Sequence, residues 1–306
     1  MVAEFAVTHM ATVIDGNAVA AEIRGGLGEA IDALGDAGVT PGLATVLMSD
    51  DPASETYVSM KQHACEKVGI NGIHVELAAD APAEELYETI AELNDDPEVN
   101  GILVQMPVPD HVDESTVLEA IDPAKDVDGF HPFNVGRLVA GEARFRPCTP
   151  HGVLKLLESV GVDTEGKDVV IVGRSQIVGK PLANLLLQKN ADGNATVTVC
   201  HSRTTDLAAH TRRADIVIAA AGAPELITGD MLTDGVTVID VGVNRVDADN
   251  EKGYELVGDV EFDSAEAKAE YITPVPGGVG PMTIAMLLYN TVLAAGEQHD
   301  VRVALP

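Results

Sequence analysis

The stretch VVIVGRSQIVGKPLANLL, residues 169–186, decides the fold class of this chain. It has the pattern of a buried strand, a turn that begins at Gly173 and a helix that opens near Gly179. Its spacing differs from G-x-G-x-x-G, because Arg174 and Gln176 stand within the turn. A helix that begins in this way presents free N–H groups and a positive dipole to a phosphate. A tight strand-to-helix turn without a ligand is the alternative when the stretch is taken alone.

Strands and helices alternate throughout the chain. Apolar runs predict strands at 42–49, 73–77 and 101–106 in the first half and at 168–172, 196–200, 216–221 and 236–241 in the second. The helices expected between them cover 51–69, 82–93, 151–160, 180–190 and 204–212. Continuous apolar runs are typical of parallel strands buried on both faces. The βαβαβ order of the second half therefore predicts a doubly wound parallel sheet.

The length of the chain and a cluster of prolines and glycine near its middle predict two domains. At roughly 100–200 residues per domain, 306 residues suffice for two. The prolines and the glycine of PCTPHG, 147–152, mark the boundary between them. The last helix, expected over Met282–Ala295, is apolar nearly all round, so we expect it to be buried against the first domain.

The composition excludes several classes of protein. The 19 lysines and arginines stand against 49 aspartates and glutamates, a formal charge of −30, which excludes a polybasic surface for nucleic acid or anionic membranes. Aromatic residues make up 3% of the chain and tryptophan is absent, so the stacking platforms of a single-strand binder are lacking. Three cysteines far apart in the sequence do not form a disulfide framework.

The acidic excess is spread along the chain, with no acidic tail. An ordinary solvated surface is one interpretation, but a charge of −30 exceeds what solubility requires. Near molar salt the Debye length is about 3 Å, so self-repulsion is screened there. We therefore expect a protein from a halophile.

Two segments bear on the compartment. The start, MVAEFAVTHMATVIDG, has no basic n-region, so no signal peptide is expected. The uncharged run from Tyr271 to Gly296 contains three prolines. A helix from Met282 to Gly296 would be about 22 Å long, too short for a hydrocarbon core of roughly 30 Å. We expect no membrane partner and a cytoplasmic location.

The second strand of the nucleotide domain ends in CHSR, residues 200–203. NAD sites carry an acid at this place for the ribose 2′-hydroxyl, whereas NADP sites accept a 2′-phosphate. Ser202 and Arg203 offer a hydroxyl and a cation there, and Arg174 is expected across the turn. Asp206 fits better as the cap of the next helix. In a chain with ten arginines, this placement favours NADP.

Polar groups also stand out in the first half of the chain. Tyr57, Lys61 and Cys65 are spaced i, i+4, i+8, so they share one face of a helix. A lysine that snorkels at the helix edge is the plainer interpretation of Lys61. A satisfied core amide is the plainer interpretation of Gln105, which stands at the end of the third strand.

Two loops complete the set of candidate segments. KDVDGFHP, 125–132, carries the carboxylates Asp126 and Asp128, but the histidines nearby lack the spacing of metal ligands, so no metal is expected. PVPGGVGPMT, 274–283, lets the backbone approach a flat or charged ligand, because glycine has no Cβ. A flexible linker is the alternative for this loop, and its three prolines disfavour it.

Seven motifs stand in order along the chain. They are Y-V-x-x-K (57–61), GILVQMPVP (101–109), KDVDGFHPFNVGRL (125–138), PCTPHG (147–152), GRSQIVGKP (173–181), DVGVNR (240–245) and PVPGGVGPMT (274–283). With these motifs the chain closely resembles the bifunctional methylenetetrahydrofolate dehydrogenase/cyclohydrolase family. The resemblance extends from about Ile14 to the final helix.

The resemblance implies a two-lobed α/β fold: a substrate lobe, a Rossmann-like NADP-binding lobe and a C-terminal helix that returns to the first lobe. The boundaries that we expect are 1–148, 149–281 and 282–306. The resemblance also implies a homodimer, folate bound in a cleft, and a place in one-carbon metabolism and purine biosynthesis. The ligase domain of trifunctional relatives is not expected, because no chain remains for it.

The resemblance further implies the roles of individual residues. Lys61 is the catalytic lysine, Gln105 aligns it and contacts the substrate, Tyr57 stacks on the folate, and Asp128 holds the donor groups of the pterin ring. The other substrate-binding residues are Val104, Met106, Pro276, Gly277, Gly278, Val279 and Gly280. The cofactor-binding residues are Gly173, Arg174, Ser175, Ile177, Ser202, Arg203, Val243 and Thr283, with Ser202 facing the 2′-phosphate. In many relatives a second basic residue follows the lysine by two positions, and here that residue is His63.

The implied chemistry has two steps. The methylene carbon loses a hydride to NADP, and water then attacks the methenyl cation to give 10-formyltetrahydrofolate. The second step needs a base with a pKa near neutral, which a lysine desolvated on an apolar helix face can supply. Whether tetrahydrofolate or a modified pterin is the native carrier is left open.

Three alternative functions are weighed against this one. They are a dehydrogenase that has lost the cyclohydrolase step, another two-lobed NADP oxidoreductase of the shikimate-dehydrogenase kind, and a nucleotide-sensing protein without turnover. Lys61 with Gln105 argues against the first two, and the set completed by Asp128 argues against the third.

Overall fold

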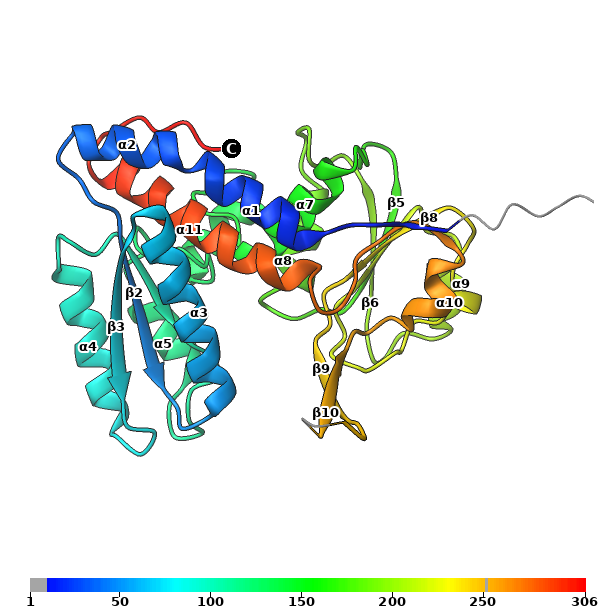
Figure 1. The fold of residues 1–306 in the computed structure, drawn as a ribbon, viewed down its shortest axis with the longest axis horizontal. Helices are drawn as coiled ribbons and strands as arrows, with labels where there is room; N and C mark the ends of the chain where they lie inside the picture. The colour runs from blue at the N-terminus through cyan, green and yellow to red at the C-terminus, as the bar shows by residue number, and fades with distance from the viewer. Residues whose placement is uncertain (1–9, 251–252) are drawn as a thin grey trace, which may run out of the picture. The chain divides into compact units, whose positions relative to one another are not determined.

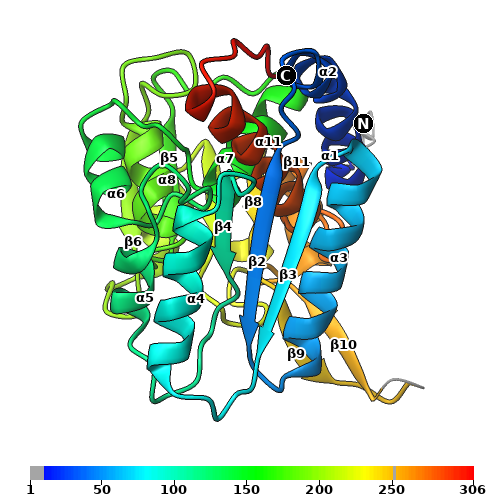
Figure 2. The same ribbon diagram turned by 90° about the vertical axis from the view of Figure 1, so that its left-hand side faces the viewer.

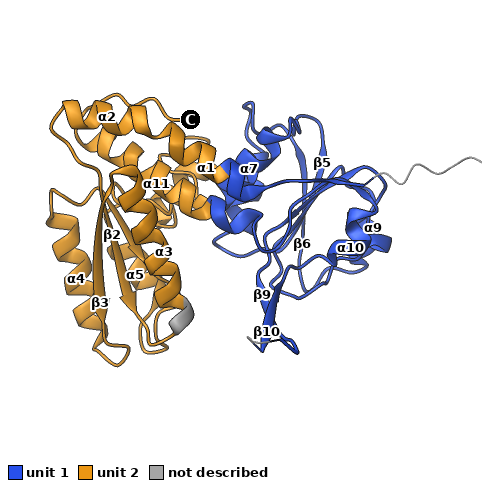
Figure 3. Cartoon of the chain, viewed as in Figure 1, with its two compact units in different colours: residues 1–19, 149–282 blue, residues 20–148, 283–306 orange. Residues whose placement is uncertain are grey.

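The computed structural model describes residues 10–250 and 253–306, without the side chains of residues 52 and 53. The chain divides into two compact units (Figure 3). Unit 1 comprises the described residues up to Val19 together with Thr149–Met282, and unit 2 comprises Ala20–Cys148 and Thr283–Pro306. Most of the amino-terminal segment, for which no signal peptide is expected, lies outside the described residues. Unit 2 is thus assembled from two segments that are distant in the sequence.

Unit 1 is built on a six-stranded sheet in which every neighbouring pair is parallel (Figure 1). In spatial order the strands are β1 (Thr12–Val13), β11 (Ala269–Ile272), β8 (Val236–Asp240), β7 (Ile216–Ala219), β5 (Asp168–Val172) and β6 (Thr196–Cys200). Every residue of β7 and β8 is buried, as expected for continuous Val/Ile runs. The doubly wound parallel sheet predicted for the second half of the chain is confirmed.

Short helices connect the strands of unit 1. They are α7 (Cys148–Ser159), α8 (Gly179–Leu186), α9 (Leu207–Thr211), the 3₁₀ helix η1 (Gly229–Met231) and α10 (Phe262–Glu266), with a two-stranded hairpin of β9 (Asn244–Asp247) and β10 (Tyr254–Val257). Helix α8 packs against β5 and β6 through buried leucines such as Leu182 and Leu186. Asp206 caps α9 as expected, because its side chain accepts a hydrogen bond from the Ala209 amide.

Unit 2 contains a three-stranded parallel sheet in the order β3 (Asn71–Leu77), β2 (Gly42–Met48) and β4 (Gly101–Val104). Helix α3 (Pro52–Val68) packs against β2 and β3, and α4 (Ala83–Asp95) packs against β4 and α5 (Glu114–Ala120) (Figure 2). The face of α4 formed by Leu86, Ile90 and Leu93 is buried, as the spacing predicted. The remaining helices are α1 (Gly16–Gly26), α2 (Gly28–Asp36), α6 (Pro132–Val139) and α11 (Val279–Gln298).

The final helix α11 is longer than the sequence predicted. It spans Val279–Gln298, so Val279 and Gly280, expected in a loop, belong to its first turn. At 1.5 Å per residue it measures about 30 Å, and the argument from length against a membrane span was wrong. Among the described residues it is the one helix that is long and apolar enough to cross a membrane. However, 72% of its apolar stretch is buried inside the molecule. Such burial identifies the core helix of a folded domain.

The end of α11 is tied to the first part of unit 2. The Gln298 side chain donates hydrogen bonds to the carbonyl oxygens of Asn100 and Ala124, each over 2.9 Å. The expected return of the C-terminal helix to the first lobe is therefore confirmed.

Candidate active site

Lys61 lies on the buried face of α3. The helix begins after Asp51, whose carbonyl accepts a hydrogen bond from the Glu55 amide. It stops at Gly69, whose φ of +86° favours glycine. Lys61 is only 9% exposed, and Cys65 one turn later is buried too. Tyr57 shares their spacing but is 48% exposed, so the three residues do not form one uniformly buried stripe.

Gln105 fixes the amine of Lys61. The Lys61 Nζ donates a hydrogen bond to Gln105 Oε1 over 2.8 Å. The backbone amide of Gln105 donates to the Val46 carbonyl, and its side-chain Nε2 donates to the Met106 carbonyl, both over 2.8 Å. Since the nitrogen of the amide is committed in this way, its oxygen is held toward the lysine. Gln105 is therefore an orienting group for Lys61.

Burial and the neighbouring charges act on Lys61 in opposite directions. Burial lowers the pKa of Lys61, and the charges of Asp128 and Cys148 oppose that shift. Burial raises the pKa of Asp128, which Lys61 and a hydrogen bond from the Cys148 thiol pull back down. The pKa of Lys61 therefore depends on the charge of Asp128.

The two carboxylates of the loop before α6 have different tasks. Asp126 is buried and accepts from the amides of Phe130 and His131 and from the Asn134 side chain. Burial raises the pKa of Asp126 to about 7. Its bonds fix the loop, whereas Asp128 is the carboxylate that faces Lys61. The nearby Lys125 is also structural, because its Nζ caps the carbonyls of Leu93 and Asp96 at the end of α4.

Other residues expected to bind substrate have varied surroundings. Val104 is buried at the end of β4, and Met106 is partly exposed just after Gln105. In unit 1, Pro276 is exposed and Gly277 has a φ of +102°, which only glycine adopts readily. Gly278 is buried. The role of this loop in binding stays a prediction.

The turn after β5 requires its two glycines. Gly173 has a φ of +143°, and a Cβ on it would collide with the Ala220 carbonyl oxygen. A Cβ on Gly179 would collide with the Gly173 carbonyl oxygen, so the start of α8 presses directly on the end of β5. The Ser175 hydroxyl oxygen accepts from the amides of Val178 and Gly179 and thereby caps α8. Its hydroxyl hydrogen still leaves it a donor.

The residues expected around a 2′-phosphate lie at one edge of the sheet. Strands β5 and β6 are parallel neighbours with Val172 opposite Cys200, so Arg174 and Ser202 each follow their strand by two residues. Arg174, Ser202 and Arg203 are all exposed. The carboxyl ends of neighbouring parallel strands are where doubly wound sheets bind nucleotides. These residues fit an anionic group of the cofactor.

The remaining cofactor-binding candidates also have defined positions. Ile177 is exposed within the turn before α8, and Val243 is 49% exposed between β8 and β9. Thr283 is partly buried in α11.

The loops beside the cofactor-binding candidates are held by buried carboxylates. The sequence analysis did not identify these carboxylates. Asp259 accepts from the amides of Ala221, Gly222 and Ala223 after β7, and Asp240 accepts from those of Gly242 and Asp259. Burial raises the pKa of Asp240 to about 6. The DVGVNR motif contained the only signal for Asp240 in the sequence.

Cys148 is the functional neighbour that sequence reasoning missed. It was considered only as a half-cystine, yet it is buried, and its thiol hydrogen-bonds with Asp128. Its place in PCTPHG was the available signal.

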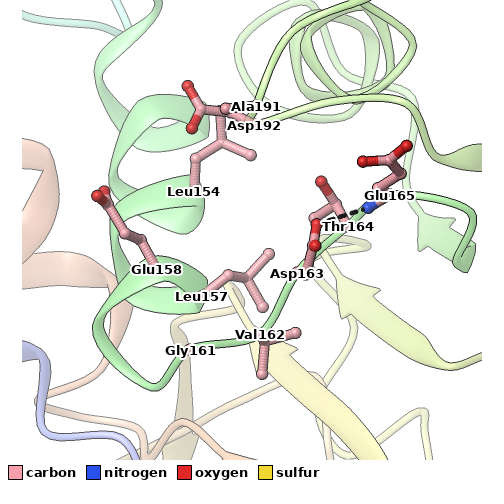
Figure 4. Close-up of a pocket in the computed structure, with 10 residues that line it drawn as sticks. All are labelled: Leu154, Leu157, Glu158, Gly161, Val162, Asp163, Thr164, Glu165, Ala191 and Asp192. Atoms are coloured by element: carbon pink, nitrogen blue, oxygen red, sulfur yellow. Dashed lines mark hydrogen bonds between the residues drawn. The ribbon is translucent and has the colours of Figure 1, made fainter.

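A pocket of about 390 Å³ lies elsewhere in unit 1 and contains none of the expected site residues (Figure 4). Its rim carries the carboxylates Glu158, Asp163, Glu165 and Asp192. Across residues 10–250 and 253–306, no three histidine, cysteine or acidic side chains are grouped so as to hold a metal ion. The pocket therefore offers no chemistry comparable to that around Lys61.

The parallel sheet with its glycine turn, and the buried lysine of unit 2, together define a nucleotide-dependent α/β enzyme. The family described as tetrahydrofolate dehydrogenase/cyclohydrolase matches the chain twice: its catalytic domain over residues 14–128 and its NAD(P)-binding domain over residues 147–299. The chain belongs to the tetrahydrofolate dehydrogenase/cyclohydrolase family. It is accordingly an enzyme with two activities, a dehydrogenase and a cyclohydrolase.

Relatives with a bifunctional FolD name cover nearly the whole chain. The bifunctional protein FolD of Natronomonas pharaonis is 72% identical over 297 residues, which is 97% of this chain and 100% of the relative. FolD 1 of Haloarcula marismortui is 70% identical over the same shares of both chains. Both relatives come from halophilic archaea, which confirms the expectation of a halophilic source.

Solved structures show the same fold. The bifunctional FolD enzyme of Campylobacter jejuni has a TM-score of 0.88 at 50% identity, covering 94% of this chain and 99% of its own. The methylenetetrahydrofolate dehydrogenase-cyclohydrolase of Trypanosoma brucei, complexed with NADP cofactor and inhibitor, has a TM-score of 0.89 at 43% identity, covering 94% and 98%. The two-lobed α/β fold class is confirmed.

Proposed function

We propose that the chain oxidises 5,10-methylenetetrahydrofolate with NADP and hydrolyses the methenyl product to 10-formyltetrahydrofolate, with Lys61 as the general base of the hydrolysis. The observation that carries the role of Lys61 is its 2.8 Å hydrogen bond to Gln105 in a buried place. Burial lowers the pKa of Lys61, so more of the amine is neutral near pH 7 than in an ordinary lysine. A neutral amine can accept the proton of an attacking water.

The neighbours of Lys61 have distinct parts in this proposal. As water bonds to the methenyl carbon, Lys61 takes its proton, and the resulting ammonium can return a proton to the ring nitrogen that leaves. Gln105 holds the amine in one orientation throughout. Asp128 binds the pterin donors, and the half-exposed Tyr57 ring stacks on the folate. Val104, Met106 and the 276–280 segment complete the set of substrate-binding residues.

We propose NADP rather than NAD as the partner of unit 1, which forms the Rossmann-like domain, while unit 2 forms the folate domain. NADP supplies the hydride acceptor of the oxidation. Gly173 and Ser175 would hold its phosphates at the turn, and Arg174 would bind the 2′-phosphate together with Ser202 and Arg203. The exposed hydroxyl and cations at one sheet edge support this choice, as does the NADP complex of the Trypanosoma brucei relative. Ile177, Val243 and Thr283 are the remaining cofactor contacts that we propose.

We further propose that the enzyme works as a homodimer in the cytoplasm. Family resemblance supports the dimer, and the similarity to bifunctional FolD enzymes supports the location. Sedimentation in molar KCl would give the mass of the particle, and a monomer at micromolar concentration would contradict the first part.

The substitution Lys61→Met tests the central role. It keeps the length and the apolar packing of the side chain while removing the amine. We expect cyclohydrolase activity to fall about 10²-fold or more, the usual cost of removing a general acid–base group. Dehydrogenase activity should fall less, because hydride transfer depends chiefly on positioning. Both are measured in parallel, by NADPH formation at 340 nm and by the decay of added methenyltetrahydrofolate above its uncatalysed rate.

Lys67→Met provides the matched control, because Lys67 lies on the same helix and is exposed. It makes the same change of charge without touching Gln105, and both activities should stay near those of the wild type. If Lys61→Met hydrolyses the methenyl compound as fast as the wild type, Lys61 is not the base of the hydrolysis.

A further inference from the structure

Asn290 is a buried asparagine in the middle of the apolar helix α11, 1% exposed. Its side-chain nitrogen Nδ2 donates to the Val127 carbonyl over 2.7 Å and to the Arg146 carbonyl over 2.9 Å. Both hydrogens of the amide are thus used. A polar side chain so deeply buried is retained only where its hydrogen bonds are made.

The two carbonyls that Asn290 holds stand directly beside the lysine site. Val127 precedes Asp128, and Arg146 precedes Cys148 by two residues. The same Nδ2 lies 3.8 Å from the Cys148 Sγ. The Asn290 amide therefore links the two backbone segments that carry Asp128 and Cys148, the acidic and the thiol neighbour of Lys61.

The Val127 carbonyl has a second partner. The Cys148 thiol donates a hydrogen bond to it over 3.5 Å, an ordinary length for a sulfur donor, and the same thiol interacts with the Asp128 carboxylate. A carbonyl oxygen has two lone pairs, so it accepts from the Asn290 amide and the Cys148 thiol together. Asn290 and Cys148 thus hold one carbonyl, directly before Asp128.

We propose that Asn290 is a positioning residue of the active site: its amide fixes the backbone at Val127 and Arg146 and so keeps Asp128 and Cys148 in register with Lys61. Asn290 touches neither substrate nor cofactor in this role. The inference rests on the proposed function of Lys61.

The titratable groups of this cluster are Lys61 on α3, Asp126 and Asp128 on the loop before α6, and Cys148 at the start of α7. Without Asn290 the Val127 and Arg146 carbonyls lose their hydrogen bonds from its amide, so the backbone that carries Asp128 can shift away from Lys61. A more distant Asp128 raises the pKa of Lys61 less, so that pKa falls. The rising limb of the hydrolysis rate then moves to lower pH.

Asn290→Ala and Asn290→Leu test the proposal in the full-length protein with NADP in molar KCl. Alanine removes the amide, and leucine keeps a branched side chain while losing the two N–H donors. For both we expect kcat/KM for methenyltetrahydrofolate hydrolysis to fall about tenfold or more, mostly through KM, as a displaced binding group predicts. The limb of the pH–rate profile should move to lower pH.

Thr291→Val is the matched control. Thr291 is the next residue of α11 and is equally buried, but its hydroxyl bonds only to the Leu287 carbonyl of its own helix. The control should lower the melting temperature somewhat and leave KM and the pH limb unchanged. Asn290 variants that melt lower but keep the wild-type KM and pH limb would overturn the proposal. So would a failure of both variants to fold, since Asn290 would then serve the fold alone.

A double substitution separates this inference from the function on which it rests. In an Asp128→Asn background, Asn290→Ala should cost little more, because two groups that act through one contact are not additive. Additive losses would count against Asn290 alone. An inactive wild type, or a fully active Lys61→Met, would count against the lysine instead.

Discussion

Lys61 is buried beside a carboxylate whose charge opposes the effect of its burial. Desolvation lowers the pKa of Lys61, and Asp128 raises it. If Asp128 loses its charge, the pKa of Lys61 must fall further, because the neutral amine is then favoured more. The site thus balances the binding of substrate against the basicity of the lysine.

Asp128→Asn makes that balance measurable. We expect the limb of hydrolysis that rises with pH to move to lower pH, since the amine is deprotonated sooner, while KM for the folate rises because a charged binding group is lost. The pH–rate profile of kcat/KM records the first effect and saturation kinetics the second. Asp110→Asn, a change at an exposed carboxylate of the same unit, should do neither. A limb that stays in place would show that Asp128 does not influence Lys61.

Arg174→Ala addresses the choice of cofactor. Arg174 is exposed at the carboxyl end of β5, next to the edge where Ser202 follows β6. Loss of its charge-assisted contact should weaken NADP about tenfold and leave NAD nearly unchanged, because only NADP carries the 2′-phosphate. Fluorescence titration with both nucleotides measures this. Equal losses of affinity for NADP and NAD would show that Arg174 shapes the turn and does not bind the 2′-phosphate. Arg212→Ala is the control, because Arg212 is exposed and donates to the Asp230 carbonyl.

The contact of α8 with β5 depends on the absence of one side chain. A Cβ on Gly179 would lie 2.9 Å from the Arg174 Cα and would overlap the Gly173 carbonyl. Gly179→Ala should push the helix from the strand, lower the melting temperature and weaken NADP at least tenfold, because the phosphate-binding turn loses its shape. Gly25→Ala, in the last turn of α1 where an added Cβ meets nothing, should instead stabilise by about 0.5–1 kcal/mol. Unchanged NADP binding in Gly179→Ala would refute this view of the turn.

Elements with local signals were predicted well from the sequence, and those without them were not. Apolar runs located the three strands of unit 2 and strands β5, β6, β7 and β8 of unit 1, and Gly69 located the end of α3. Strands β1 and β11, at one edge of the six-stranded sheet, were not predicted. The starts of α7 and α11 were predicted three residues late, because Pro150 and Pro281 were taken as boundaries. Both prolines stand at the third helical position. A backbone N–H in this first turn has no partner within the helix, so a proline there removes no hydrogen bond.

Only part of the candidate active site could be predicted from the sequence. Helical spacing put Lys61 on an inward face, but its bond to Gln105 joins residues 44 positions apart, and only the family motifs suggested it. Tyr57 has the same spacing and is nevertheless half exposed. Asn290 lies in an apolar helix whose local pattern contains no sign of the two carbonyls it meets, because these belong to a segment more than 140 residues earlier.

For the whole molecule, charge determines how stability depends on salt. The 19 basic residues cannot neutralise 49 acidic ones, and pairs such as Lys268 with Asp234 lie at the surface. Molar KCl should raise the melting temperature relative to low salt, because screening removes repulsion among the carboxylates. Sorbitol at equal osmolality is the control, since it excludes itself from the surface without screening charge. A melting temperature that is flat or falls with KCl would contradict the expectation.

The division of the chain also bears on its synthesis. Asn290 meets Val127 across 163 positions, and Gln298 meets Asn100 across 198, so unit 2 closes only after nearly all residues have been joined. The parallel sheet of unit 1 is complete by Ile272. During synthesis from the amino terminus, the sheet of the nucleotide unit is therefore finished before α11, which supplies Asn290 to the surroundings of the lysine site, has been made.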